Sequence, residues 1–393
     1  MKTNTFQVPS IPLSDCSLQI RIATEPWEKR EIYRLRYEVY VQEMAKPLGS
    51  TVNKEKLLYD SLDKSSILLY AQDGSNIVAT IRLSIAAEED YPSELVKAFC
   101  MDKFLALHTD MPNRHFGLGT KLAVKTQYRN SPALYLIITE AYRLLREHNV
   151  QICFTGCNPY LISLYERMGF RKFAGNFTDP GYGLLVALVM VVEDIEHFQA
   201  VKSPLYRHAR KYNNNSAMAR RFLQVFPEAT TYLNSQLADK KGLWKYIQHK
   251  LHISPYDFPT FRGLDEENIM AILTAGVIFS CTPGDFVLHP NSLCNDLYII
   301  LSGTLVATSQ IGSHLLRPGN HFGSFTRPNL IHQKESISAL TEAEIFVLSL
   351  QAFARYQHLH PQAAEILLNN LTNTQNFAYA CATLTEQGGK ENE

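Results

Sequence analysis

The sequence predicts an α+β protein: a mixed sheet flanked by helices, then a helical linker, then a C-terminal β-roll. Residues 121–170 alternate between β-type and helical patterns, and two β-rich runs within 66–85 meet at a tight turn. Beyond residue 256, short β-runs are separated by glycines, a pattern typical of a small jelly roll. We therefore expect three parts, at residues 18–200, 201–255 and 256–380.

The first elements are expected to be a strand, a helix and a hairpin. Residues 18–23 alternate as a strand does, and residues 27–44 have the spacing of an amphipathic helix that carries Arg36 and Tyr40. Asp73-Gly74, between the two β-rich runs, is a strong signal for a hairpin turn.

The central stretch, 121–170, follows the order strand, helix, strand, helix. Asn130-Ser131-Pro132 offers an N-cap with proline at the first helical position, and the apolar helical spacing continues to Asn149. Residues 151–155 are expected as a short buried strand, and the second helix runs from Asn158-Pro159 to Gly169. The two strands of this unit should therefore be parallel neighbours.

The remaining elements complete a sheet and add the linker and the roll. Residues 170–194 form two strands around the turn Asp179-Pro180-Gly181. The region 197–251 is helical, and its basic residues, Arg207, Arg210 and Arg220 among them, form either a solvated helix face or a dock for an acidic carrier protein. The roll is expected between the helices 266–274 and 350–371, with turn glycines at 284, 303, 319 and 323.

Composition excludes several classes of protein. The 38 basic and 38 acidic residues balance, so no nucleic-acid partner is indicated. There is no run of about 18 apolar residues, which predicts no transmembrane segment. The N-terminus also lacks an apolar signal core, and we expect a cytoplasmic protein. The seven cysteines are scattered without a CxxC pair, so neither a disulfide framework nor a metal site is expected.

The central stretch, with Tyr128-Arg129, Asn158, Tyr165 and Gly169-Phe170 at its corners, resembles the GNAT acyltransferase superfamily. The resemblance implies two splayed strands that admit an acylated pantetheine arm. It also implies that Asn158 binds this arm and that the hydroxyl of Tyr165 protonates the departing thiolate. A phenol can supply that proton because its pKa lies above the value of about 8.5 for a thiol.

The turn that would bind the donor phosphate departs from the coenzyme A-dependent members of that superfamily, which carry glycines there. No glycine occurs between Gly119 and Gly156. What remains is Arg129 together with the N–H groups of Ala133 and Leu134, which suit one phosphate at a helix N-terminus. Phosphopantetheine on a carrier protein has one phosphate where coenzyme A has a diphosphate. We therefore expect acyl carrier protein as the donor, with acyl coenzyme A as the alternative, and no tightly bound cofactor.

Three further segments are similar to acyl-homoserine lactone synthases and N-acyl amino acid synthases: LRYEVYVQEM (35–44), LLYDSLDKS (57–65) and ATIRLS (79–84). These families transfer a fatty acyl group from acyl carrier protein to the amine of a small molecule. The resemblance implies that charged residues on these segments shape the amine and acyl sites, namely Arg36, Asp60, Asp63 and Arg82. Tyr40 and Lys121 are expected to bind the substrate as well. The alternative is an ion-pair network on the surface.

One position of that pattern is changed. The families carry a glutamate and then an arginine where this sequence has Leu118 and Lys121, so a positive charge is kept and a carboxylate is lost. The general base is therefore open: Asp60 or Asp63 acting through water, or no base at all in an inactive domain. The absence of a tryptophan after the first helix favours the amino acid synthases, with an amino acid or a similar small amine as acceptor.

The C-terminal roll resembles the cyclic-nucleotide-binding domain. In that family a glutamate after a Phe-Gly pair binds the ribose and an arginine binds the cyclic phosphate. Here the pair is Phe322-Gly323, and the two places hold Ser324 and Gln333, with Lys334 adjacent. A phosphate without a charged partner loses about 1.5 to 3 kcal/mol, so a cyclic nucleotide ligand is not expected unless Arg327 or Lys334 compensates.

Two other functions remain open at the level of sequence. The first is a non-catalytic sensor that binds an acyl ligand, which the loss of the carboxylate at Leu118 favours. The second is a lysine acetyltransferase that uses acyl coenzyme A under cyclic-nucleotide control, since the two domain types share one chain. The missing turn glycines and the changed phosphate cassette argue against the latter.

Overall fold

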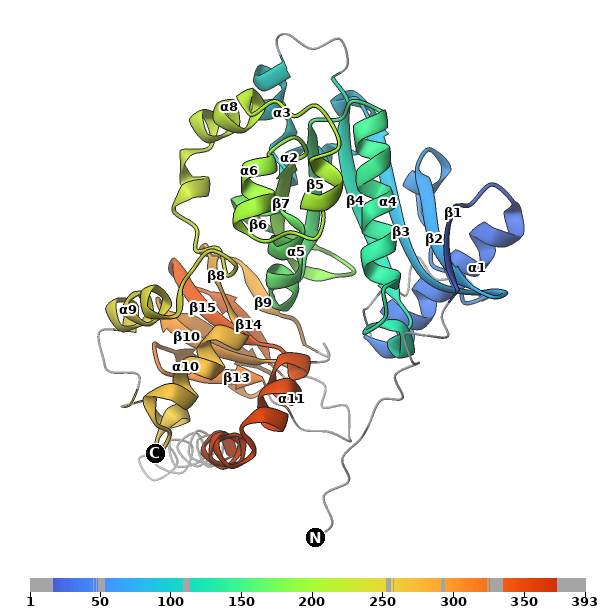
Figure 1. Cartoon of the computed structure of the whole chain (residues 1–393). Coiled ribbons are helices and arrows are strands. Elements are labelled where there is room, and N and C mark those ends of the chain that lie inside the picture. The colour runs from blue at the N-terminus through green and yellow to red at the C-terminus, as the bar shows by residue number, and fades with distance from the viewer. Residues whose placement is uncertain are drawn as a thin grey trace. The chain divides into compact units, whose positions relative to one another are not determined.

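The computed structural model describes residues 17–44, 46, 48, 54–108, 114–251, 256, 258–290, 294–323, 325 and 335–372 (Figure 1). These residues divide into two compact units, one within Met1–Asn158 and Leu164–Tyr232, the other within Pro159–Ser163 and Leu233–Glu393. The division falls inside 201–255, so the segment expected as a linker is shared between the units. In the described ranges, no helix has the length and apolar character needed to cross a membrane.

The first unit is built on a seven-stranded mixed sheet in the order β1-β2-β3-β4-β5-β7-β6. Neighbouring strands are antiparallel except β4 and β5, which are parallel as the sequence predicts. The strands are β1 (Leu18–Ile22), β2 (Ile67–Asp73), β3 (Asn76–Ala86), β4 (Phe116–Val124), β5 (Ile152–Cys157), β6 (Arg171–Asp179) and β7 (Gly183–Val191).

The parallel strands β4 and β5 pair over a short distance. Their register joins Gly117 to Cys153 and Leu118 to Phe154, and no further backbone pair follows in the described part of either strand. Lys121 has a φ of +55°, and the register of β4 against β3 shifts beside it. This bulge turns β4 away from β5, so the pair opens toward its carboxyl ends.

Helices cover both faces of this sheet: α1 (Pro26–Tyr37), α2 (Ser93–Ala98), α3 (Met101–Leu105), α4 (Ala133–Glu147), α5 (Ile162–Met168), α6 (Ile195–Ala200), α7 (Tyr206–Ala209) and α8 (Ala217–Val225). A Cβ on Gly117 would meet Leu145 of α4 at 2.5 Å. Its neighbours along β4, Phe116 and Leu118, belong instead to a buried aromatic cluster that includes Phe226. Since alternate strand residues point to opposite faces, α4 and the aromatic cluster lie on opposite sides of the sheet.

Element boundaries differ from the sequence expectation at two places. The helix expected over 27–44 is α-helical only to Tyr37 and continues as a π-helix, Glu38–Glu43. The helix α4 begins at Ala133, one residue after the proline, and Ser131 Oγ accepts its first N–H at 3.2 Å. Ser131 therefore accepts the first N–H of α4, although Pro132 occupies the N-cap position.

The second unit contains two four-stranded antiparallel sheets, β13-β10-β15-β8 and β12-β11-β14-β9, as expected for a jelly roll. The turn glycines 284, 303, 319 and 323 all have positive φ, which explains their occurrence. Helices α9 (Lys240–Leu251), α10 (Glu266–Ala275) and α11 (Leu350–Leu359) and a helical segment at 361–372 pack with the roll around one core. The strands are β8 (Val277–Cys281), β9 (Phe286–Leu288), β10 (Leu297–Ser302), β11 (Leu305–Ser309), β12 (Gly312–Leu316), β13 (His321–Gly323), β14 (Ser336–Ala339) and β15 (Ala343–Leu348).

Candidate active site

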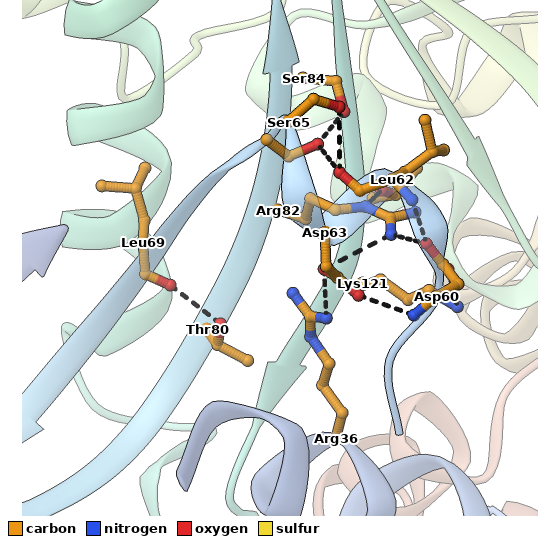
Figure 2. Close-up of polar contacts among 12 residues, drawn as sticks. Arg36, Asp60, Leu62, Asp63, Ser65, Leu69, Thr80, Arg82, Ser84 and Lys121 are labelled. Atoms are coloured by element: carbon orange, nitrogen blue, oxygen red, sulfur yellow. Dashed lines mark hydrogen bonds and ion pairs between the residues drawn. The ribbon is translucent and has the colours of Figure 1, made fainter. Parts of the chain in front are cut away.

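Five charged side chains from four segments of the first unit meet in one cluster (Figure 2). Arg36 at the end of α1 donates from Nη1 to Asp63 Oδ1 at 2.7 Å. Arg82 on β3 donates from Nη1 to Asp60 Oδ1 and lies 3.5 Å from Asp63 Oδ1. Lys121, at the bulge of β4, places Nζ 3.3 Å from Asp60 Oδ2. Arg36, Asp60, Asp63 and Arg82 converge, and Lys121, also expected at the substrate site, lies with them.

The two carboxylates are positioned by the start of a short helix, Ser61–Lys64. Asp60 is its N-cap and accepts the N–H of Leu62 at 3.1 Å, while Asp63 Oδ2 accepts the N–H of Asp60 at 2.9 Å. This reciprocal capping box holds both side chains in fixed orientations. It accounts for the occurrence of two aspartates three residues apart in LLYDSLDKS.

The cluster is closed at one end and open at the other. The side chains of Arg36, Asp63 and Arg82 are at most 4% exposed, and that of Lys121 is 12% exposed. Asp60 is 33% exposed, so it is the member that a ligand can reach. Burial raises the pKa of Asp60, but the charges of Arg82 and Lys121 outweigh this and hold its pKa below the usual value.

The cluster carries a surplus of positive charge, because two carboxylates face two guanidinium groups and one ammonium group. Burial lowers the pKa of Lys121, Asp60 partly offsets this, and the neighbouring guanidinium groups lower the pKa further. Among the described residues, Nε and Nη2 of Arg36 have no hydrogen-bond partner although both atoms are buried. Buried donors without partners are costly, so the cluster favours an additional anion or polar group.

Two tyrosines lie beside the cluster: Tyr40, which was expected at the substrate site, and Tyr182, which the sequence did not single out. Lys121 Nζ donates to the hydroxyl of Tyr182 at 2.8 Å. The ring of Tyr182 packs edge-on against Tyr40, whose hydroxyl donates to the carbonyl of Leu122 at 2.7 Å. Burial raises the pKa of both phenols, so they remain neutral. Tyr182 follows the turn in which Asp179 Oδ1 accepts its N–H, and no short motif links that turn to the cluster.

Asn158 and Tyr165 belong to the second half of the predicted motif. Asn158, after β5, donates from Nδ2 to the carbonyls of Tyr182 at 3.0 Å and Leu184 at 2.9 Å. It therefore braces the end of β5 against β7. Tyr165 lies on α5 and is partly buried, with its ring packed edge-on against Phe170 at a centroid distance of 5.7 Å.

The expected phosphate-binding residues have partners of their own. Arg129 makes a bidentate ion pair with Glu43, with Nη1 2.5 Å from Oε1 and Nη2 2.7 Å from Oε2. The N–H of Ala133 donates to Ser131 Oγ, whereas the N–H of Leu134 has no hydrogen bond within the described part of the chain. Glu43, from the π-helix, was not among the predicted site residues.

Of the residues predicted to form the nucleotide-like pocket of the roll, the structure describes Gly323, the last residue of β13. Its φ is +83°, and a Cβ there would lie 2.0 Å from the carbonyl oxygen of Asp296. Glycine at 323 is therefore fixed by packing within the roll. The other predicted pocket residues lie outside the described ranges, namely Ser324, Gln333 and Lys334.

Comparisons with known proteins agree with both parts of the chain. Residues 31–192 match the family described as N-acyl amino acid synthase FeeM, and residues 278–358 match the cyclic nucleotide-binding domain. The matched range 31–192 contains all five residues of the charged cluster.

Individual proteins resemble the chain more distantly. The structure of FeeM, an N-acyl amino acid synthase from uncultured soil microbes, is 12% identical and covers 49% of this chain and 98% of that one, with a TM-score of 0.38. A cyclic nucleotide-binding domain from Methylobacillus flagellatus is 14% identical and covers 38% of this chain and 87% of that one, with a TM-score of 0.33. Glutaminase 2 of Bradyrhizobium diazoefficiens is 24% identical over 156 residues, 39% of this chain; the chain spans about a quarter (24%) of that protein's length.

Proposed function

We propose, from the premise that residues 31–192 form an N-acyltransferase domain of the N-acyl amino acid synthase type, that the acceptor is an amino acid and the donor is acyl carrier protein. The buried charged cluster with its surplus positive charge carries this proposal. The match of residues 31–192 to the N-acyl amino acid synthase family supports acyl transfer to an amine, and the cluster supports the identity of the acceptor.

An amino acid carries an ammonium group and a carboxylate, and the cluster has a partner for each. Asp60 is ionised and reachable, and it receives the ammonium group of the acceptor. The carboxylate of the acceptor offsets the surplus positive charge around Lys121 and Arg82. A simple amine would add a second positive charge without this compensation, which a partly buried site disfavours.

The reaction needs a neutral amine and a protonated leaving group. Asp60 takes one ammonium proton through water, and the free amine attacks the thioester carbonyl. The N–C bond forms first, and the attacking nitrogen then gives its second proton to solvent. As the C–S bond breaks, the hydroxyl of Tyr165 gives its proton to the departing thiolate and is reprotonated from solvent. Asp63 accepts hydrogen bonds from Arg36 and from the N–H of Asp60, and it therefore positions both residues of the cluster. Asn158, at the open end of the β4–β5 pair, lines the path of the pantetheine arm.

The donor follows from the single phosphate-binding position at the start of α4. Arg129 and the free N–H of Leu134 suit one phosphate, and that phosphate replaces Glu43 as the partner of Arg129. Acyl coenzyme A brings a diphosphate to a turn without glycines, where fewer backbone N–H groups are available.

The full-length protein tests both assignments in one set of assays. Acylated carrier protein and acyl coenzyme A with the same acyl chain are compared as donors, each with an amino acid and with the amine that remains when its carboxyl group is removed. We expect a higher kcat/KM for the carrier-bound donor and for the amino acid, with N-acyl product identified by mass spectrometry. Equal kcat/KM values for the two donors, or for the two acceptors, would contradict the corresponding assignment.

A further inference from the structure

A cavity of about 590 Å³ lies on the first unit, between the first turn of α4 and the segment formed by α6 and α7. Aromatic and basic side chains line it, including Tyr135 from α4, Phe198 from α6, and Lys202, Tyr206 and Arg207 beyond it. Neither the charged cluster nor the β4–β5 opening contributes a residue to its lining.

The walls of this cavity are held by specific contacts. Tyr135 OH and His208 Nε2 form a hydrogen bond of 2.9 Å that joins α4 to α7. The buried Ser203 donates from Oγ to the carbonyl of Met168 at 3.1 Å and accepts the N–H of Leu205. Lys202 has a φ of +53°, an uncommon conformation for a lysine, which fixes the start of the loop. The cavity is therefore a built feature of the surface.

The surface at the cavity is basic, and its positive charges have no carboxylate partners among the described residues. Lys202 and Arg207 line the cavity, and Arg210 and Lys211 follow directly after α7. All four are exposed, and within the described ranges no carboxylate lies within ion-pair distance of any of them. The basic residues of α4 differ in this respect, because each arginine there has a glutamate partner. Exposed cations without partners produce a positive field that attracts an acidic macromolecule.

The location of the cavity indicates which acidic macromolecule this is. Tyr135 is the third residue of α4, next to the N–H groups of Ala133 and Leu134 to which we assign the donor phosphate. A carrier protein attaches that phosphate beside an acidic helix, so its acidic face must lie near the start of α4.

We propose that this cavity, with Lys202 and Arg207 in its lining and Arg210 and Lys211 directly after α7, is the docking surface for the acyl carrier protein. The proposal rests on the proposed function, since it requires a carrier-bound donor. It refines the sequence expectation, because Arg207 lines the cavity and Arg210 caps α7, whereas Arg220 lies on α8.

The test uses the full chain and two donors with the same acyl group, acyl carrier protein and the thioester of free pantetheine. Lys202→Glu/Arg207→Glu should raise KM for the acylated carrier roughly tenfold or more at low salt, and less at high salt. Its kcat/KM with the pantetheine thioester should equal that of the unaltered chain. Lys97→Glu/Lys103→Glu on α2 and α3 makes the same change in net charge on exposed residues elsewhere, and should leave both donors unaffected.

The outcomes separate the two proposals. If the unaltered chain prefers acyl coenzyme A to the acylated carrier, the donor assignment fails and the docking surface with it. If the carrier is used but both double variants behave alike, the carrier docks elsewhere and only the docking proposal is overturned. Loss of activity with the pantetheine thioester as well would show that these residues support the fold of the catalytic unit, which also overturns it.

Discussion

Asp60 and Asp63 lie three residues apart, but their carboxylates have different surroundings. Both oxygens of Asp63 are occupied, one by Arg36 and the other by the N–H of Asp60, and the side chain is 2% exposed. Asp60 shares its oxygens with Arg82 and Lys121 and is reachable from solvent. Removing one partner of a buried ion pair leaves an uncompensated charge, so Asp63 is best understood as a positioning residue and Asp60 as the contact to the acceptor.

At the same scale, Tyr165→Phe should lower kcat by about 10² or more, because the hydroxyl acts on the thiolate that develops in the transition state. The KM for the donor should change little, since the ring and its contact with Phe170 are retained. Steady-state kinetics on purified protein measure this, with circular dichroism as a check of folding. Unchanged turnover would remove Tyr165 from the mechanism.

Whether a site residue is predictable from sequence depends on whether it belongs to a recognisable sequence segment or is brought to the site by the tertiary fold. Arg36, Asp60 and Arg82 occur in recognisable segments, and the structure brings them together. Tyr182 and Glu43 could not be foreseen: the first arrives through the turn between β6 and β7, and the second through a π-helix where a regular helix was expected. Such contacts depend on the tertiary path of the chain, which a short motif does not encode.

Among the elements, α8 shows why a linker was expected and why the structure differs. Its sequence is polar and basic on the surface, but Phe222 on its inner side and Phe226, the residue directly after the helix, are buried against Phe104 of α3. Because α8 has only nine residues, its buried aromatic positions repeat too few times for helical periodicity to be recognised among its charged residues. By contrast, the hairpin at Asp73-Gly74 and the strand–helix–strand unit carried strong turn and cap signals and were predicted correctly.

This packing predicts the effect of truncating α8 side chains. Phe226→Ala removes a ring that is 1% exposed and stacks on Phe104 at 4.5 Å, which should cost about 3 to 5 kcal/mol of unfolding free energy. Leu223→Ala within α8, at a side chain that is 37% exposed, should change stability by less than about 0.5 kcal/mol. Urea unfolding of the two variants provides the measurement. Equal shifts in midpoint would indicate that the segment before residue 232 does not belong to the first core.

The chain combines a domain that matches the N-acyl amino acid synthase family with a roll that matches the cyclic nucleotide-binding domain, each with a hydrophobic core of its own. The roll keeps the glycines that its turns require, and Gly323 is fixed by its approach to Asp296. These glycines preserve the fold and say nothing about the ligand, because the residues that would contact a nucleotide follow them in the sequence. We propose that the roll regulates or docks the enzyme without responding to a cyclic nucleotide.

The last prediction is that the full-length protein binds neither cyclic AMP nor cyclic GMP tightly. Ser324 offers the ribose a neutral hydroxyl, and Gln333 offers the phosphate no charge. Loss of the charged contact alone, about 1.5 to 3 kcal/mol, predicts affinity from tenfold to more than a hundredfold below that of a complete cassette. Lys334 could place an ammonium on the phosphate after a one-residue shift, but a point charge does not reproduce the arginine fork. Calorimetry on the unaltered chain and on Ser324→Glu/Gln333→Arg provides the comparison, with binding expected only in the variant. Submicromolar binding by the unaltered chain would make cyclic-nucleotide control of acyl transfer the better hypothesis.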